Sequence, residues 1–185
     1  DYPQVTVHLE ATNRRVDVIE EGFDIAIRVR FPPLDNSDLV MKVLGNSMQC
    51  LVASPSYLAH FSTPPTPADL SGLPSLYWGS AHREYAWELF GPNGASALIR
   101  HAPKLITDDL PALRQAAMAG LGVVHVPHVV VRDELAAGLL VNVLPDWTPK
   151  SGIVHAVFPS RRGLLPSVRT LIDFLAQEFS HSDVI

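Results

Sequence analysis

Short apolar, β-rich segments alternate with helix-like segments along nearly the whole chain. The helix-like pattern is clearest near the C-terminus, where Val168, Leu171, Ile172, Leu175 and Phe179 fall on one helical stripe, as on a helix packed against a sheet. Strands that alternate with helices predict an α/β fold with mixed, mostly parallel sheets. The predicted strands are 5–9, 23–29, 39–44, 48–53, 76–78, 123–126, 139–143 and 153–158; the predicted helices are 16–22, 54–60, 110–119, 130–137 and 168–179.

Side chains suited to helix ends and turns mark several of these boundaries. Ser54 is placed to cap a helix that starts at Pro55. The run Gly91–Ala95 predicts the tip of a hairpin. The apolar run Phe23–Val29 is typical of a strand buried on both faces. A break at Gly45-Asn46 separates two of the predicted strands.

Composition excludes several classes of protein. Of the 185 residues, 47% are hydrophobic and 18% are charged, which is enough apolar material for a sizeable core. No apolar run approaches the ~18 residues that a bilayer span requires. The net charge of −5 makes this chain by itself a poor partner for nucleic acid. The single cysteine, Cys50, excludes an internal disulfide and is predicted to be a buried, inert thiol.

Motifs for catalysis, cofactors and metals are missing from the sequence. Gly120-Leu121-Gly122 follows a helix and precedes a strand, the reverse of the order in dinucleotide-binding folds. His125 and His128 have no carboxylate or thiol beside them, so residues facing a core or cleft are a better interpretation than a metal pair. No nucleophile is assembled with a base. The sequence therefore predicts no enzyme, no cofactor and no metal site.

Three sets of polar residues have both a structural and a ligand-binding interpretation. Asp108 and Asp109 either only cap a helix or mark a helix N-terminus that faces a ligand. Arg28, near the end of a strand, either forms a surface ion pair or holds an anionic ligand. Thr12 and Asn13 either cap a helix or contact a ligand from a strand-end loop.

Several blocks, in their order and spacing, resemble the effector-binding domain of LysR-type transcriptional regulators. The most specific is Arg15–Arg28, which reads RVDVIEEGFDIAIR. Asp1–Leu9, Leu34–Val40, Cys50–Leu58 and Thr66–Pro74 resemble further blocks of the family, as does Asp108–Pro127 with its AGLGVV segment. The resemblance covers essentially the whole chain.

The resemblance implies two Rossmann-like lobes joined by two crossing strands, as in type II periplasmic binding proteins. Lobe I would comprise residues 1–46 and 153–185, and lobe II residues 47–152. A small effector would bind in the cleft between them. The matched effector positions are Thr12, Asn13, Arg28, Ala102, Asp108, Val126 and Pro127.

The implied function is that of a ligand-sensing domain in a cytoplasmic transcription regulator. A homodimer or homotetramer would form through the effector domain, with the helix matching Leu110–Ala119 in the contact. DNA would be bound only through a winged helix-turn-helix domain, which the sequence lacks, together with the first strand and most of the first helix of the effector domain. No membrane partner is expected. The alternative is an extracytoplasmic solute-binding protein of similar fold.

Overall fold

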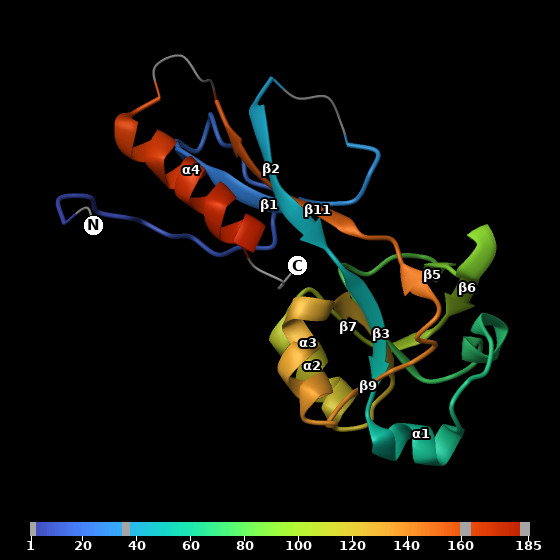
Figure 1. The fold of residues 1–185 in the computed structure, drawn as a ribbon. Coiled ribbons are helices and arrows are strands. Elements are labelled where there is room, and N and C mark those ends of the chain that lie inside the picture. Colours follow the sequence, from blue (N-terminus) through green and yellow to red (C-terminus); the bar gives the residue numbers. More distant parts are fainter. Residues whose placement is uncertain (1–2, 35–37, 160–163, 182–185) are drawn as a thin grey trace. The chain divides into compact units, whose positions relative to one another are not determined.

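The computed structural model describes residues 3–34, 38–159 and 164–181 (Figure 1). The chain divides into two compact units. Unit 1 comprises residues 1–46 and 152–185, and unit 2 comprises residues 47–151. The chain thus passes from unit 1 to unit 2 after Asn46 and returns before Gly152, one residue earlier than the boundary expected from the sequence.

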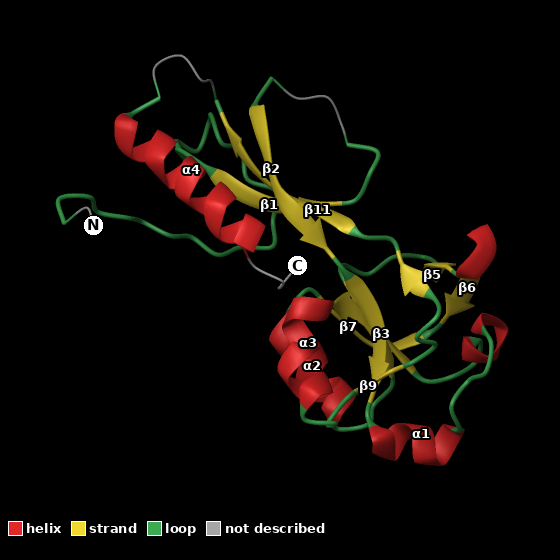
Figure 2. Cartoon of the chain, viewed as in Figure 1, coloured by secondary structure: helices red, strands yellow, loops and turns green. Residues whose placement is uncertain are grey.

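Unit 1 is built on a three-stranded sheet in the order β1 (Ala26–Arg30), β11 (Gly152–Phe158), β2 (Val40–Ser47). The helix α4 (Pro166–His181) covers one face of this sheet, as Figure 2 shows. Four of the five residues of the predicted amphipathic stripe are confirmed, because Val168 and Ile172 are buried and Leu175 and Phe179 pack against the sheet. Leu171 is the exception, since it is 38% exposed. Burial of this apolar stripe stabilises the helix more than its intrinsic propensity does.

The N-terminal part of unit 1 differs from the sequence-based expectation. Residues 5–9 alternate as a strand would, but they form no strand, and Val7 and Leu9 are 69% and 86% exposed. Alternation produces a strand only where another strand offers its backbone for pairing, and no described strand pairs with this segment. The predicted helix 16–22 is also wrong. It is a hydrogen-bonded turn that ends at Gly22, with φ +73°.

Two strands of unit 1 also depart from the prediction. β1 is only half-buried, with Ile27 50% exposed, because α4 covers a single face. The break predicted at Gly45-Asn46 lies further along the chain. β2 continues through these residues to Ser47, and Met48 alone separates it from β3.

Unit 2 contains a five-stranded sheet and a three-stranded sheet. The five-stranded sheet has the order β7 (Pro103–Thr107), β4 (Ser75–Trp78), β8 (Val123–Pro127), β3 (Gln49–Ala53), β9 (Val141–Asn142). The other has the order β10 (Thr148–Pro149), β5 (Tyr85–Phe90), β6 (Ser96–His101). The helices are α1 (Pro55–Phe61), α2 (Leu110–Met118) and α3 (His128–Ala136), with 3₁₀ turns at Pro67–Leu70 and Pro92–Gly94.

The predicted α/β fold is confirmed, but the sheets are not mostly parallel. Among the described strand pairs with a defined register, β4 pairs in parallel with β7 and with β8, and the other five pairs are antiparallel. Pairing direction depends on which distant strands meet, and local alternation does not encode this.

The local signals at helix ends and turns are confirmed in unit 2. The Ser54 side chain caps α1 by accepting a hydrogen bond from the Tyr57 amide at 3.2 Å. The run Gly91–Ala95 lies at the tip of the β5–β6 hairpin. Among the described residues, no helix has both the length and the apolar character of a membrane span.

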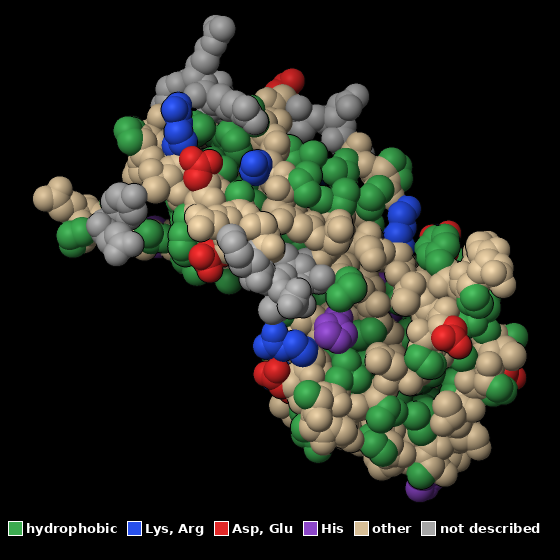
Figure 3. Space-filling view, viewed as in Figure 1, with side chains coloured by type: hydrophobic (Ala, Val, Ile, Leu, Met, Phe, Trp, Pro, Cys, Tyr) green, Lys and Arg blue, Asp and Glu red, His purple; other side chains and the backbone are tan. Residues whose placement is uncertain are grey.

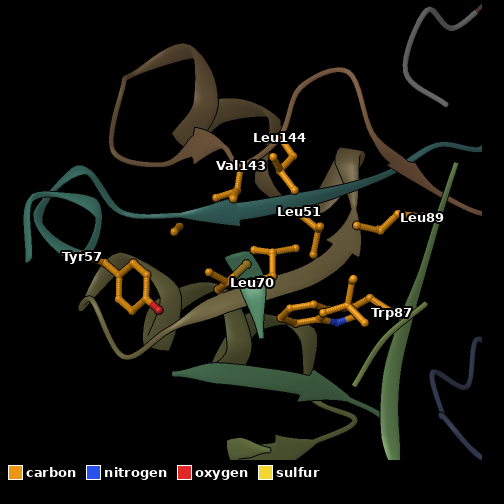
Figure 4. Close-up of a cluster of buried hydrophobic side chains, with 10 residues drawn as sticks. Leu51, Tyr57, Leu70, Trp87, Leu89, Val143 and Leu144 are labelled. Carbon is orange, nitrogen blue, oxygen red and sulfur yellow. The ribbon is translucent and has the colours of Figure 1, made fainter. Parts of the chain in front are cut away.

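The five-stranded sheet of unit 2 has a core on each face. On one face, Leu76, Val124 and Val126 pack against Leu113 of α2 and Val131 of α3. On the other face the β5–β6 hairpin supplies large apolar side chains, and Figure 4 shows them converging on the sheet. This second cluster includes Leu51, Tyr57, Leu70, Trp87, Leu89, Val143 and Leu144.

Gly122 lies too close to the start of β4 to carry a side chain. A Cβ there would lie 2.7 Å from the Pro74 carbonyl oxygen and 2.9 Å from the Ser75 Cα. Both are backbone atoms, so no side-chain rotation relieves the clash. We expect Gly122→Ala to lower the free energy of unfolding by about 2–3 kcal/mol in urea denaturation. Gln115→Ala, on the exposed face of α2, is the control, and a Gly122→Ala variant as stable as this control would contradict the packing.

Candidate ligand-binding site

Strands of unit 2 end together at one edge of its five-stranded sheet. Because β4 runs parallel to both β7 and β8, their carboxyl ends at Trp78, Thr107 and Pro127 share this edge. β3 runs the opposite way and begins there, with Gln49 opposite Pro127. The edge beyond the carboxyl ends of parallel strands is where open α/β sheets bind ligands.

The helix α2 begins at the same edge, directly after β7. Asp109 caps it, since its Oδ1 accepts a hydrogen bond from the Ala112 amide at 3.1 Å. The Asp109 amide in turn donates to Thr107 Oγ1 at 3.1 Å. The capping role therefore falls on Asp109, and the neighbouring Asp108 is exposed at the edge. This arrangement keeps the ligand-binding interpretation of Asp108 open.

The other matched positions of unit 2 lie in different surroundings. Pro127 is buried at the end of β8. The Val126 side chain is fully buried in the cluster under α2 and α3, where it serves the core. Ala102 precedes β7 and so lies at the amino end of that strand, roughly 16 Å of extended chain from Thr107. The structure therefore brings Asp108 and Pro127 to one edge and places Ala102 at the opposite end.

In unit 1, Arg28 ties a turn to the sheet. Its Nη2 donates to the Val16 carbonyl at 2.6 Å, and it lies opposite His155 in the β1–β11 pair. Burial, and then the positive charges of Arg30 and Arg15, lower the pKa of the Arg28 guanidinium. A guanidinium has five N–H donors, so the bond to Val16 does not exhaust it.

Thr12 and Asn13 are exposed in an irregular bend, and no helix follows them. Thr12 Oγ1 accepts a bond from the Arg14 amide at 3.4 Å. Asp17 makes the cap-like contacts instead, because its Oδ1 accepts from the amides of Ile19 and Glu20 at 3.0 Å each. The helix-capping interpretation of Thr12 and Asn13 is therefore wrong.

Two histidines whose ring Nε2 atoms are buried, His101 and His125, lie on the hairpin side of the unit 2 sheet. His101 Nδ1 is 2.7 Å from Ser75 Oγ, and its ring stacks on Trp87 with centroids 3.9 Å apart. Burial lowers the pKa of His101 to about 4, and burial followed by the charge of His101 lowers that of His125 to about 4. The sequence predicts that His125 faces a core or cleft, but it gives little indication of His101, whose one signal is the inward alternation 97, 99, 101 along β6.

Metal and thiol chemistry find no support at these positions. Among the described residues, no group of three or more His, Cys, Asp or Glu side chains could hold a metal ion. The Cys50 thiol is 3.6 Å from the Val126 carbonyl oxygen, and burial raises its pKa to about 12. A thiol with so high a pKa is unreactive at neutral pH, as the sequence predicts.

Comparisons with known proteins identify the family. Residues 1–180 match the LysR substrate binding domain. The chain is 29% identical over 187 residues to the HTH-type transcriptional repressor PA14_22550 of Pseudomonas aeruginosa strain UCBPP-PA14, covering 100% of this chain and 58% of that protein. It is 30% identical over 179 residues to the HTH-type transcriptional activator AaeR of Escherichia coli K12, covering 97% of this chain and 57% of that protein.

A solved structure agrees with these matches. The full-length virulence activator AphB of Vibrio cholerae, described as a member of the LTTR family, has a TM-score of 0.83 and 26% identity. The match covers 96% of this chain and 59% of that chain. The chain therefore belongs to the LysR substrate-binding domain family and is an effector-binding domain of the LysR-type regulators. Its relatives are transcriptional regulators rather than enzymes, and the solute-binding alternative is not favoured.

Proposed function

We propose that this domain binds a small metabolite and thereby changes how a cytoplasmic transcription regulator acts on DNA. The observation that carries the proposal is the shared edge of unit 2, where three strand ends and the first turn of α2 meet. Such an edge offers backbone N–H groups and polar side chains to a ligand. Asp108 and Pro127 are the proposed effector contacts of unit 2, and Thr12, Asn13 and Arg28 those of unit 1.

DNA contact and assembly are proposed for the regulator as a whole. The chain spans 58% and 57% of the lengths of the two regulators compared above, so DNA binding is assigned to sequence outside it. The charge of −5 supports this assignment. On the face drawn in Figure 3, the Lys and Arg side chains are scattered rather than gathered in one patch.

We propose assembly into a homodimer or homotetramer through this domain. The exposed face of α2, with Ala112, Gln115 and the adjoining Ala119, supports the contact, since small side chains allow close helix approach. Leu113 and Ala117 pack inward and are unavailable for it. Sedimentation equilibrium tests the assembly: Gln115→Arg would weaken a dimer that uses this face and leave unchanged a dimer that does not.

A thermal-shift screen of metabolites tests the proposed function. A true effector at 100 times its dissociation constant should raise the free energy of unfolding by about 2.7 kcal/mol. The proposal fails if no compound in a broad metabolite panel stabilises the chain while a known effector stabilises a related regulator domain under the same conditions.

Arg28 is expected to strengthen binding of an anionic effector. Arg28→Met keeps much of the aliphatic bulk and removes the charged donors, so we expect about a tenfold or greater loss of affinity by calorimetry. Arg30→Met is the matched control, because Arg30 is the exposed cation two residues along the same strand. Unchanged affinity in Arg28→Met would assign Arg28 only to the support of the Val16 turn.

A further inference from the structure

The β5–β6 hairpin is attached to the five-stranded sheet of unit 2 through side chains. Among the described strand pairs, β5 pairs only with β6 and with the two residues of β10, so the hairpin shares no strand pairing with that sheet. Its inward side chains include Trp87 and Leu89, which converge on Leu51 of the sheet (Figure 4). The core on the other face of the sheet, under α2 and α3, contains no residue of the hairpin. Departure of the hairpin would therefore leave that core and the five paired strands in place.

Two imidazole rings lie in the contact between the hairpin and the sheet. His101, the last residue of β6, stacks on Trp87 and reaches β4, where its Nδ1 is 2.7 Å from Ser75 Oγ. His125 lies on β8, opposite Leu51 of β3. The Nε2 atoms of both rings are buried and have no hydrogen-bond partner among the described residues. A protonated ring would therefore carry an N–H at Nε2 that has no acceptor.

The described polar side chains around these rings are a hydroxyl, phenols and an imidazole rather than carboxylates. On the sheet side, β4 presents the Ser75 hydroxyl and the phenol of Tyr77, whose ring centroid lies 6.1 Å from that of His101. On the hairpin side, the ring of Tyr85 on β5 lies 6.2 Å from that of His101. The imidazole of His82, on the exposed loop before β5, contacts the rings of both tyrosines.

Charged side chains are confined to the solvent side of these elements. The strands β3, β4 and β8 contain no Asp, Glu, Lys or Arg. The charged side chains of the hairpin, of the loop before it, of β7 and of the 3₁₀ turn that contacts β6 are all exposed: Asp69, Arg83, Glu84, Glu88, Arg100 and Lys104. A proton taken up by either ring would therefore place an unpaired charge between the hairpin and the sheet, which is costly.

We propose that the hairpin is an acid-sensitive latch: it stays on the sheet while His101 and His125 are neutral, and protonation of these rings releases it before the rest of unit 2 unfolds. Release gives the protonated rings access to water, which solvates the charge that the closed contact leaves unpaired. Burial lowers the pKa of both rings to about 4, in keeping with a neutral, closed state at neutral pH. The released state exposes the apolar face that carries Leu51 and Val123, so acid changes the surface of unit 2 without any effector.

The test is amide hydrogen exchange of the chain at pH 6.5 and pH 4.5, with rates corrected for intrinsic exchange at each pH. Protection of the hydrogen-bonded amides of β5 and β6 should fall on the order of 30-fold for each ring that titrates, because the released rings bind protons more tightly. At pH 4.5 this protection should lie about tenfold or more below that of amides in β3 and β8, because the five-stranded sheet stays formed. Hairpin protection that does not change with pH, or that equals the protection of β3 and β8 at pH 4.5, would overturn the proposal.

Two variants and a control assign the response to the two rings. His101→Phe keeps a flat ring on Trp87 and removes the titrating nitrogens, so it should reduce the fall in hairpin protection. His101→Phe combined with His125→Gln should abolish the fall. His82→Gln, which removes the exposed imidazole of the loop before β5, should leave the fall unchanged. An undiminished fall in the double variant would contradict the proposal.

Discussion

Lowering the pH from about 6.5 to about 4.5 is expected to destabilise this chain through the buried imidazoles of His101 and His125. Both have a pKa of about 4 in the folded state, against an ordinary value of 6.5. Between these values the unfolded chain binds more protons than the folded one, so the free energy of unfolding falls as the pH falls and levels off below about 4. The full loss is on the order of 3 kcal/mol for each ring at most, because one unit of pKa shift corresponds to about 1.4 kcal/mol.

Urea denaturation at a series of pH values measures this loss. His125→Gln should flatten the pH dependence, because it removes the titrating ring from the core. His60→Gln is the control, since His60 is exposed on the last turn of α1. Glu21 forms a salt bridge with Arg14, which lowers the pKa of the Glu21 carboxyl from 4.5 to about 2. Protonation of Glu21 would therefore change the free energy of unfolding only below pH 4.5. Stability that stays constant from pH 6.5 to pH 4.5 would show that the two rings are not buried as described.

Trp87→Ala is expected to cause the largest loss of stability from a single substitution, about 3–5 kcal/mol. Trp87 lies on β5, and its side chain is buried in the apolar cluster of Figure 4, on the hairpin side of the five-stranded sheet. Its indole stacks on the ring of His101 with an interplanar angle of 18°. Removing the indole leaves a cavity between the two sheets of unit 2. It also admits water to His101, which should bring the pKa of His101 back toward 6.5 and reduce the acid sensitivity.

A substitution on the same strand provides the matched control. Phe90 also lies on β5, but it is exposed, so Phe90→Ala should cost less than about 1 kcal/mol. Denaturation of both variants at neutral pH gives the comparison. If Trp87→Ala and Phe90→Ala cost the same, the hairpin does not pack on the sheet through Trp87.

Features set by neighbours in sequence could be predicted, because their physical causes are local. Ser54 caps α1 through an amide only three residues away, and the stripe of α4 depends only on helical periodicity. The strand expected at residues 5–9 failed because a strand needs a partner that alternation does not specify. For the same reason the prediction of mostly parallel sheets was wrong, since most of the described strand pairs are antiparallel.

The candidate site shows the same limit. Asp108 could be predicted because it marks the start of a predicted helix, whereas Pro127 was expected only from the family resemblance. Ala102, only six residues before Asp108, lies at the other end of β7, since five residues of strand separate the two. The side-chain oxygen of Gln49, at the start of β3, is buried and has no hydrogen-bond partner in the described part of the chain. This depends on the packing of distant segments, and no local pattern reveals it.

The central claim is that the shared edge of unit 2 binds the effector. The most direct measurement is an amide chemical-shift map of the chain with the best compound from the metabolite screen. The largest changes should fall at Gly79, at residues 107–112 and at His128, which follow or flank the three strand ends. Saturable binding with its largest changes at Ala102 and the amino ends of these strands, and none at residues 107–112, would contradict the claim.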